Sequence, residues 1–224
     1  SSVDTAEEIH QKLELAGINL SDDSSCCVAT GYGRISVPYA DKTVTEITCH
    51  ALGAVHLFQQ PDLTVIDIGG QDTKIIQIEQ GFVKDFIMND KCAAGTGRFL
   101  EVMANTLSLR PNEMIDLARL GSDTTISSMC TVFAESEVIG LIGKGEPKEN
   151  IAYAVVNSTI RKVAAQVSRM NGEMSTFCLT GGLCECEYIR EALSKELGKE
   201  VISCPDARYA GAIGAALSAM KVRR

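Results

Sequence analysis

The chain contains the run Leu63-Thr-Val-Ile-Asp-Ile-Gly-Gly-Gln-Asp-Thr-Lys-Ile-Ile-Gln-Ile-Glu79, whose pattern points to a β-sheet. Branched apolar residues stand on both sides of a Gly-Gly pair, which is typical of two strands joined by a tight turn. The pattern predicts strands over 63–68 and 74–79, and a third strand over 82–88 after the turn at Gly81. We therefore expect an antiparallel β-meander with glycine-rich tips.

The segment Asp67-Ile-Gly-Gly-Gln-Asp72 stands at the tip of this hairpin. Adjacent glycines let backbone N–H groups approach an oxyanion, and the two flanking acids could hold Mg²⁺ directly or through water. The simpler alternative is a tight hairpin turn with solvated acids. Two similar turns, Gly95-Thr-Gly97 and Thr180-Gly-Gly182, precede expected helices, whose N-termini suit phosphate and nucleoside groups. Neither a Walker A sequence nor the Rossmann glycine pattern occurs, so a nucleotide would bind in another way.

The rest of the chain predicts a mixed α/β protein. Helices are expected over 4–16, 44–58, 97–108, 111–120, 131–143, 148–171, 187–197 and 207–220, and further strands over 26–30, 176–180 and 200–204. The last helix contains Gly211 and Gly214, so it could pack closely on a sheet. Mixed domains usually open on a strand, whereas this chain opens on a helix. We therefore expect an N-terminally shortened piece of a longer protein.

Composition excludes several classes of function. The net charge is −8, and the only basic run is the short Lys221-Val-Arg-Arg224, which argues against a nucleic-acid partner. No apolar run approaches the roughly 20 residues of a membrane span, and the polar, acidic start is no signal peptide. The nine cysteines suggest free thiols in a reducing compartment rather than a disulfide framework. These features indicate a cytoplasmic protein.

Two cysteines stand just ahead of expected helices. They lie in Asn89-Asp-Lys-Cys-Ala-Ala-Gly-Thr-Gly-Arg98 and in Cys130-Thr-Val-Phe-Ala-Glu-Ser-Glu-Val138. A helix N-terminus favours the thiolate, which is the form that binds metal. Alternatively, both thiols are inert. The other cysteines are less persuasive: Cys26, Cys27, Cys178 and Cys204 are expected in the core, Cys49 in helix packing, and Cys184 and Cys186 without an assigned role.

These motifs, in this order, closely resemble the activator components of 2-hydroxyacyl-CoA dehydratases, a family that includes the ATPase subunits of benzoyl-CoA reductase. Ala29-Thr-Gly-Tyr-Gly-Arg34 and Tyr209-Ala-Gly-Ala-Ile-Gly-Ala-Ala216 also match. The resemblance implies an α/β, ribonuclease-H-like two-lobed fold of the actin, sugar-kinase and heat-shock-chaperone superfamily. It would make 1–60 with 205–224 the remnant of a first lobe, incomplete at its N-terminus, and 61–204 the second lobe.

The resemblance also implies a mechanism. Family members are homodimers with one [4Fe–4S] cluster, to which each subunit would contribute Cys92 and Cys130. Hydrolysis of ATP to ADP, with Mg²⁺, would drive an electron from a ferredoxin or flavodoxin onto an acyl-CoA dehydratase or reductase. The implied nucleotide site has Asp67 and Asp72 as catalytic acids, Gly69, Gly70 and Gln71 in the second phosphate loop, Gly181 and Gly182 at the adenosine, and Gly95, Thr96, Gly97 and Glu135 as further neighbours.

One departure from the family keeps alternatives open. The first phosphate loop of the family, Asp-x-Gly-Ser/Thr-x-x-x-Lys, does not occur in the chain, which leaves hydrolysis by this chain alone an open question. The alternatives are a metal-free small-molecule kinase of the same superfamily and a non-catalytic ATP-binding protein.

Overall fold

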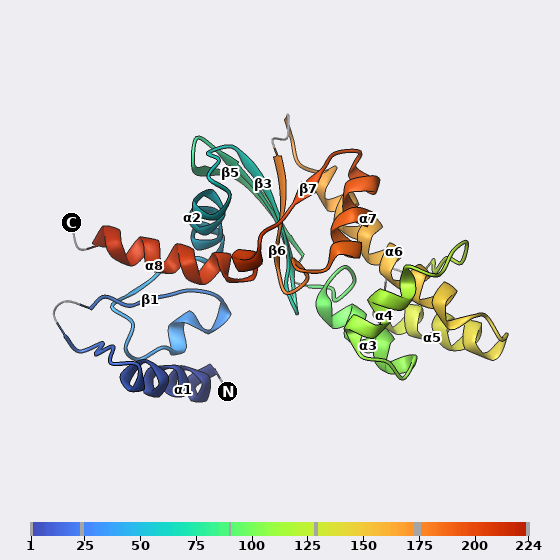
Figure 1. The fold of residues 1–224 in the computed structure, drawn as a ribbon, viewed down its shortest axis with the longest axis horizontal. Helices are drawn as coiled ribbons and strands as arrows, with labels where there is room; N and C mark the ends of the chain where they lie inside the picture. Colours follow the sequence, from blue (N-terminus) through green and yellow to red (C-terminus); the bar gives the residue numbers. More distant parts are fainter. Residues whose placement is uncertain (1, 23–24, 90, 128–129, 173–175, 223–224) are drawn as a thin grey trace. The chain divides into compact units, whose positions relative to one another are not determined.

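The computed structural model of the chain describes residues 2–22, 25–89, 91–127, 130–172 and 176–222 (Figure 1). These residues form two compact units. The first unit consists of Ser1–Asp62, Ile78–Val83 and Tyr209–Arg224, and the second of Leu63–Gln77 and Lys84–Arg208. Both units combine helices with strands, as the predicted α/β class requires.

The described residues of the first unit form three α-helices, one 3₁₀ helix and a short pair of strands. The unit contains α1 (Ser2–Leu15), β1 (Val28–Ala29), the 3₁₀ helix η1 (Tyr32–Ser36), β2 (Lys42–Thr43), α2 (Glu46–Phe58) and α8 (Ala210–Val222). β1 and β2 are parallel, with Val28 opposite Lys42. The strand expected over 26–30 is therefore shorter than predicted, because only two of its residues pair.

The small residues of α8 serve a helix–helix contact. The prediction that this helix packs on a sheet is wrong in its main partner, because α8 lies chiefly against α2. A Cβ added at Gly53 would collide with the backbone of Ala210, and one added at Gly214 would collide with the backbone of Cys49. The two helices can approach this closely only because glycine stands at both contact points.

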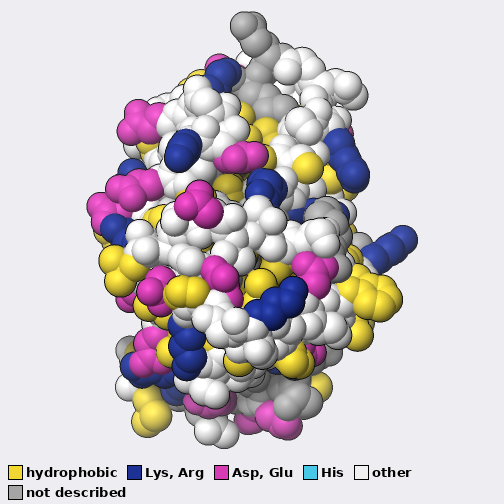
Figure 2. Space-filling view, turned by 90° about the vertical axis from the view of Figure 1, so that its right-hand side faces the viewer, with side chains coloured by type: hydrophobic (Ala, Val, Ile, Leu, Met, Phe, Trp, Pro, Cys, Tyr) yellow, Lys and Arg dark blue, Asp and Glu magenta, His cyan; other side chains and the backbone are white. Residues whose placement is uncertain are grey.

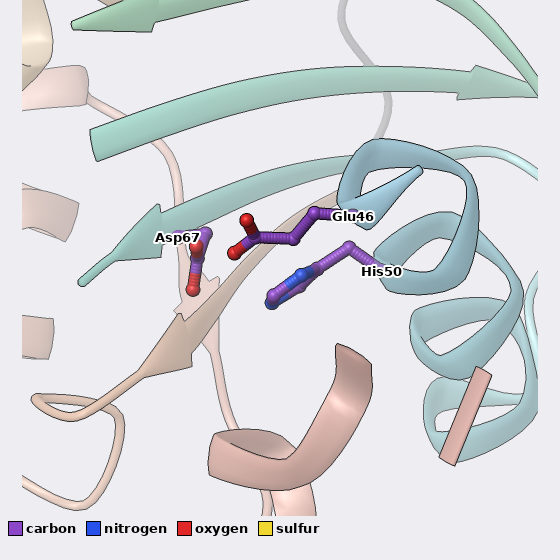
Figure 3. A group of neighbouring side chains, drawn as sticks. All are labelled: Glu46, His50 and Asp67. Carbon is purple, nitrogen blue, oxygen red and sulfur yellow. The ribbon is translucent and has the colours of Figure 1, made fainter. Parts of the chain in front are cut away.

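The start of α2 is capped and carries two polar side chains. Thr45 is the N-cap residue, and its hydroxyl accepts a hydrogen bond from the backbone N–H of Thr48 at 3.3 Å. Glu46 and His50 follow one turn apart on this helix (Figure 3). The imidazole of His50 packs on Gly211 of α8, where an added Cβ would approach the ring to 3.3 Å. This packing explains why His50 is buried.

The second unit is organised around a sheet with the strand order β5-β4-β3-β6-β7. The strands of this sheet are β3 (Leu63–Ile68), β4 (Thr73–Glu79), β5 (Phe82–Asn89), β6 (Thr176–Gly181) and β7 (Val201–Ile202), and the segment Ile78–Val83, where β4 ends and β5 begins, belongs to the first unit. The first three follow one another through short turns and lie side by side, which confirms the predicted meander. β3 is buried along its whole length, because β4 and β6 flank it on both sides.

The parallel pairing of β3 with β6 places two glycine turns at one edge of the sheet. Asp67 is opposite Thr180, and Ile68 is opposite Gly181. Parallel strands end at the same edge of a sheet, and ligands of open α/β sheets bind outside these carboxyl ends. The turn after β3 and the turn after β6 therefore stand next to each other, although more than a hundred residues separate them in the chain.

The helices of the second unit agree closely with the sequence pattern. They are α3 (Gly97–Thr106), α4 (Pro111–Ala118), α5 (Thr131–Gly143), α6 (Lys148–Val167) and α7 (Glu187–Leu197), and the 3₁₀ helix η2 (Pro205–Tyr209) precedes α8. The predicted bounds of α5 and α7 are confirmed at both ends. α6 ends earlier than predicted, and the expected start of α8 is wrong, because η2 occupies its first residues.

The surface agrees with the composition. On the face shown in Figure 2, basic and acidic side chains are interspersed, and the described residues form no broad patch of one sign. Among the residues that the structure describes, no helix is both long enough and apolar enough to cross a bilayer.

Candidate functional site

A buried ion-pair cluster lies where β3 ends and β4 begins. Asp67, labelled in Figure 3, and Asp72 are only 3% and 5% exposed. The alternative of a hairpin turn with solvated acids is therefore wrong. The ammonium of Lys74 on β4 lies 2.8 Å from Asp72 Oδ1 and 3.4 Å from Asp67 Oδ2. A lysine that is 1% exposed keeps its charge at low cost only next to carboxylates, so the three side chains depend on one another.

The turn after β6 closes on the same cluster. The hydroxyl of Thr180 donates a hydrogen bond to Asp67 Oδ1 at 3.1 Å. Gly181 has a φ of +81°, and an added Cβ would lie 2.5 Å from the carbonyl oxygen of Ile68 and 2.6 Å from Asp67 Oδ1. Only glycine accommodates both the left-handed backbone and this close approach. The backbone after β6 thus lies directly against the carboxylate of Asp67.

The third glycine turn joins the first through main-chain hydrogen bonds. The N–H groups of Gly97 and Arg98, at the start of α3, donate to the carbonyl oxygens of Gly69 at 2.9 Å and Gly70 at 2.7 Å. The hydroxyl of Thr73 donates to the carbonyl of Gly95 at 2.6 Å. Three turns that the sequence presents far apart therefore meet at one edge of the sheet. Gln71 and Gly70 are exposed at the tip, and Thr96, the N-cap residue of α3, is buried.

A cavity of about 430 Å³ opens beside the turn after β6. This volume is within the range of small-molecule sites. Its walls come from α4, from the turn after β6 and from η2, and they include Asn112, Ile115, Asp116, Gly182, Leu183, Glu185, Cys186 and Arg208. Arg208 lies 3.6 Å from Glu185, and burial raises the pKa of the Cys186 thiol. The cavity can therefore offer a carboxylate, a guanidinium and backbone groups to a polar ligand.

The two cysteines predicted as metal ligands are both exposed, but they differ in local structure. Cys130 is the N-cap residue of α5; its carbonyl accepts a hydrogen bond from the N–H of Ala134, and its side chain makes no capping bond. Cys92 is not itself an N-cap residue, because the predicted glycine turn separates it from α3, which begins at Gly97 as predicted. Instead, the side-chain amide of Asn89 donates to the carbonyl oxygens of Cys92 and Ala94, both at 2.9 Å, and so fixes the loop.

Glu135, predicted as a further nucleotide neighbour, makes its hydrogen bond away from the glycine turns. It lies on α5, and its Oε1 accepts a hydrogen bond from Thr106 at 3.2 Å. Thr106 is the last residue of α3, whereas the glycine turns meet the first residue of that helix. The length of α3 is about 15 Å, so this contact joins Glu135 to the end of α3 that is remote from the turns. The structure does not bring Glu135 together with the glycines.

The remaining cysteines are only partly in the core. Cys49, Cys178 and Cys184 are buried, but the prediction of core positions for Cys26, Cys27 and Cys204 is wrong, because these three are only half-buried. Lys74 is the charged residue of the buried cluster that the sequence analysis did not identify. A lysine inside a strand of otherwise buried residues, two positions after an acid, was the available signal.

Comparison with known proteins adds to this geometry. Residues 2–219 match the family model of the BadF/BadG/BcrA/BcrD ATPases. The (R)-2-hydroxyglutaryl-CoA dehydratase activating ATPase of Acidaminococcus fermentans is 46% identical over 221 residues, which are 96% of this chain and 83% of that protein.

Two solved structures share the fold. The crystal structure of component A of the Acidaminococcus fermentans (R)-2-hydroxyglutaryl-CoA dehydratase has a TM-score of 0.88 and 44% identity, and the match covers 97% of this chain and 83% of that one. The activator of the 2-hydroxyisocaproyl-CoA dehydratase from Clostridium difficile, solved with bound ADPNP, has a TM-score of 0.84 and 36% identity, with coverages of 96% and 80%. These similarities confirm the predicted fold class and the predicted family resemblance.

Proposed function

Because the chain belongs to the BadF/BadG/BcrA/BcrD ATPase family, we propose that it uses ATP to activate an acyl-CoA dehydratase or reductase by electron transfer. The observation that carries this proposal is the meeting of three glycine turns around Asp67, Asp72 and Lys74. Exposed backbone groups beside paired carboxylates suit a polyphosphate and its Mg²⁺ ion.

The phosphates and the metal ion are assigned to the turn between β3 and β4. Backbone groups of Gly69, Gly70 and Gln71 face the phosphates, and Asp67 and Asp72 hold Mg²⁺ directly or through water. The exposure of Gln71 and Gly70 at the tip supports this assignment. A Mg²⁺ ion held by these two acids would supply positive charge next to the phosphates in hydrolysis of ATP to ADP. Gly97 donates to the carbonyl of Gly69 and Gly95 accepts from Thr73, so we assign both, together with Thr96 between them, as supports of the phosphate loop.

The adenosine is assigned to the cavity beside Gly182. Gly181 and Gly182 form one wall, and the carboxylate of Asp116 can accept hydrogen bonds from ribose hydroxyls or from the adenine amino group. Arg208 offers a planar guanidinium on which a base can stack. A relative of the same fold has been solved with the nucleotide analogue ADPNP, which supports a nucleotide as the ligand.

Cys92 and Cys130 are assigned to a [4Fe–4S] cluster. Four thiolates are needed, so two cysteines from each subunit of a homodimer complete the set. The donors fit, because both thiols are exposed and the sulfur of Cys130 is not engaged in capping its helix. When bound, the cluster supplies a site for one low-potential electron. We assign ferredoxin or flavodoxin as the donor, a dehydratase or reductase as the acceptor, and the cytoplasm as the location of this oxygen-sensitive protein.

Anaerobic reconstitution tests this proposal. The full chain is loaded with iron and sulfide, and iron content, native mass and ATP hydrolysis are measured. We expect four irons per dimer, in line with a cubane cluster. Cys92→Ser and Cys130→Ser should lose the iron and the visible absorption, whereas Cys26→Ser, a half-buried cysteine of the first unit, should retain both.

Other outcomes identify the alternatives. A monomer that hydrolyses ATP and never takes up iron would contradict the cluster and favour a metal-free small-molecule kinase. A chain that binds ATP without hydrolysing it would be a non-catalytic ATP-binding protein. Replacement of Asp67 by Asn should lower nucleotide hydrolysis at least tenfold if this acid holds the metal, an effect on the order of 1.4 kcal/mol or more.

A further inference from the structure

We propose that Lys74 is a positioning residue that balances the charge of Asp67 and Asp72, so that the site prefers a metal–nucleotide complex to a metal ion alone. This inference rests on the proposed nucleotide function and deepens it. Lys74 is not needed to build the strand, since β4 is otherwise formed by residues typical of a sheet. Its charge therefore calls for an explanation at the site itself.

Burial makes the charge of Lys74 consequential. Its side chain is 1% exposed, and its ammonium contacts both carboxylates, at 2.8 Å from Asp72 and 3.4 Å from Asp67. Water does not screen such a cluster as it screens surface ion pairs. Two carboxylates and one ammonium leave these three side chains with one net negative charge. Without Lys74 the same side chains would carry two.

This difference acts oppositely on the two kinds of ligand. A site with two uncompensated carboxylates attracts a bare divalent cation strongly and repels a polyphosphate. The ammonium weakens the attraction for Mg²⁺ alone and lowers the repulsion of the phosphates. Lys74 thus favours the arrival of Mg²⁺ together with its nucleotide, which is the form that hydrolysis requires.

The ammonium also fixes which oxygen faces the metal. Asp67 Oδ1 accepts from Thr180, while Asp67 Oδ2 and Asp72 Oδ1 face Lys74. Asp72 Oδ2 is buried and has no hydrogen-bond partner among the described residues. A buried carboxylate oxygen without a partner is costly, so this atom is the one that a metal ion or its bound water would complete. Asp72 cannot swing freely, because its Oδ1 packs against Gly69.

The test compares Lys74→Met with the wild-type full chain by calorimetric titration. Three titrations are made: Mg²⁺ alone, ADP alone, and ADP in saturating Mg²⁺. The Met variant should bind Mg²⁺ alone about tenfold more tightly and ADP at least about tenfold more weakly. A purely structural role would weaken both ligands together. Lys74→Arg keeps the charge, so both affinities should stay near those of the wild type.

A second pair of variants repeats the test in proteins whose cluster never carries two uncompensated carboxylates. Asp72→Asn is compared with Asp72→Asn/Lys74→Met, which restores the single net negative charge. The double variant should bind Mg²⁺ alone more tightly than Asp72→Asn, and ADP alone more weakly. If the affinities for Mg²⁺ and ADP change in the same direction in either pair of proteins, the proposed role of Lys74 is wrong, whereas the proposed nucleotide function is not affected. If the wild-type chain binds no ADP at all, the proposed nucleotide function fails together with this inference.

Discussion

Because Gly181 has no Cβ atom, the end of β6 can lie directly against the end of β3. The backbone of Gly181 is left-handed, and an added Cβ would meet Ile68 and Asp67. We expect Gly181→Ala to lower the free energy of unfolding by about 1–3 kcal/mol and to weaken ADP binding. Gly182→Ala is the matched control for stability, because an added Cβ there meets nothing within 4 Å. Urea unfolding measures the loss of stability and titration measures ADP binding; equal losses of stability in the two variants would contradict the argument.

Thiol reactivity gives a second prediction at the residue scale. Burial raises the pKa of the Cys178 thiol, so its reactive thiolate is scarce near neutral pH and increases only as the pH rises toward that pKa. Iodoacetamide at pH 8 should therefore leave Cys178 unmodified in the folded, iron-free protein, while the exposed Cys92 and Cys130 are alkylated. Mass spectrometry of peptides reads the result. Unfolding in urea should make Cys178 reactive, which controls for peptide detection.

The residues of the site were only partly predictable. Asp67, the glycine turns and Asp72 carry a local signature, since glycine pairs flanked by acids are visible in any sequence. The ion pair between Lys74 and Asp67 could not be predicted from a local pattern, because the two side chains meet only when β4 pairs with β3. The contact of Glu135 with Thr106 was not predictable for a related reason, because a sequence motif does not say which face of α5 a side chain occupies.

At the scale of elements, one hydroxyl joins β4 to the loop before α3. Thr73 donates to the carbonyl of Gly95, and both residues are buried. Thr73→Val keeps the shape but leaves that carbonyl without its donor, which should lower the free energy of unfolding by about 1–3 kcal/mol. Thr64→Val is the matched control on β3, because the buried Thr64 hydroxyl has no partner among the described residues. That control should be neutral or stabilising in chemical denaturation; a loss as large as that of Thr73→Val would refute the assignment.

Elements that a glycine follows closely in the chain were predicted best. β3, α5 and α7 have the bounds that their patterns indicate, because the turn residues Gly69, Gly145 and Gly198 act locally. The short β1 and β2 pair through only two residues each, and η2 replaces the expected start of α8. Such elements exist because of tertiary packing, so their sequences alone carry too little signal.

At the scale of the whole molecule, the chain forms two compact units, and α2 and α8 allow the first unit to be perturbed by itself. Gly53→Val forces a branched side chain into the backbone of Ala210, which should cost about 1–3 kcal/mol or more. Hydrogen exchange should then increase in α2 and α8 and change little in the peptides of β3 and β6. Gly140→Ala is the control, since an added Cβ there is unobstructed within α5 and should stabilise the helix by about 0.5–1 kcal/mol. Exchange that rises equally in both units would show that they unfold as one.

The fold class was visible in the order of strands and helices, whereas the way in which distant segments meet was not. The parallel register of Asp67 with Thr180 follows from sheet pairing across the whole second unit. No local pattern specifies such a register, although it brings the turn after β6 against Asp67. The expectation that Asp67 and Gly181 belong to one nucleotide site came instead from the family resemblance, which covers nearly the entire chain.

The amide of Asn89 has a consequence for how the protein ages. Its nitrogen donates to two carbonyl oxygens, those of Cys92 and Ala94. Spontaneous deamidation during storage would turn this donor into a carboxylate that faces the same two acceptors. The carboxylate would repel both carbonyl oxygens, so the two hydrogen bonds that hold the loop around Cys92 would be lost. The fraction of protein with an intact loop would then fall during storage, even without oxygen. Storage of the purified protein in the cold and at slightly acidic pH should slow the deamidation of Asn89.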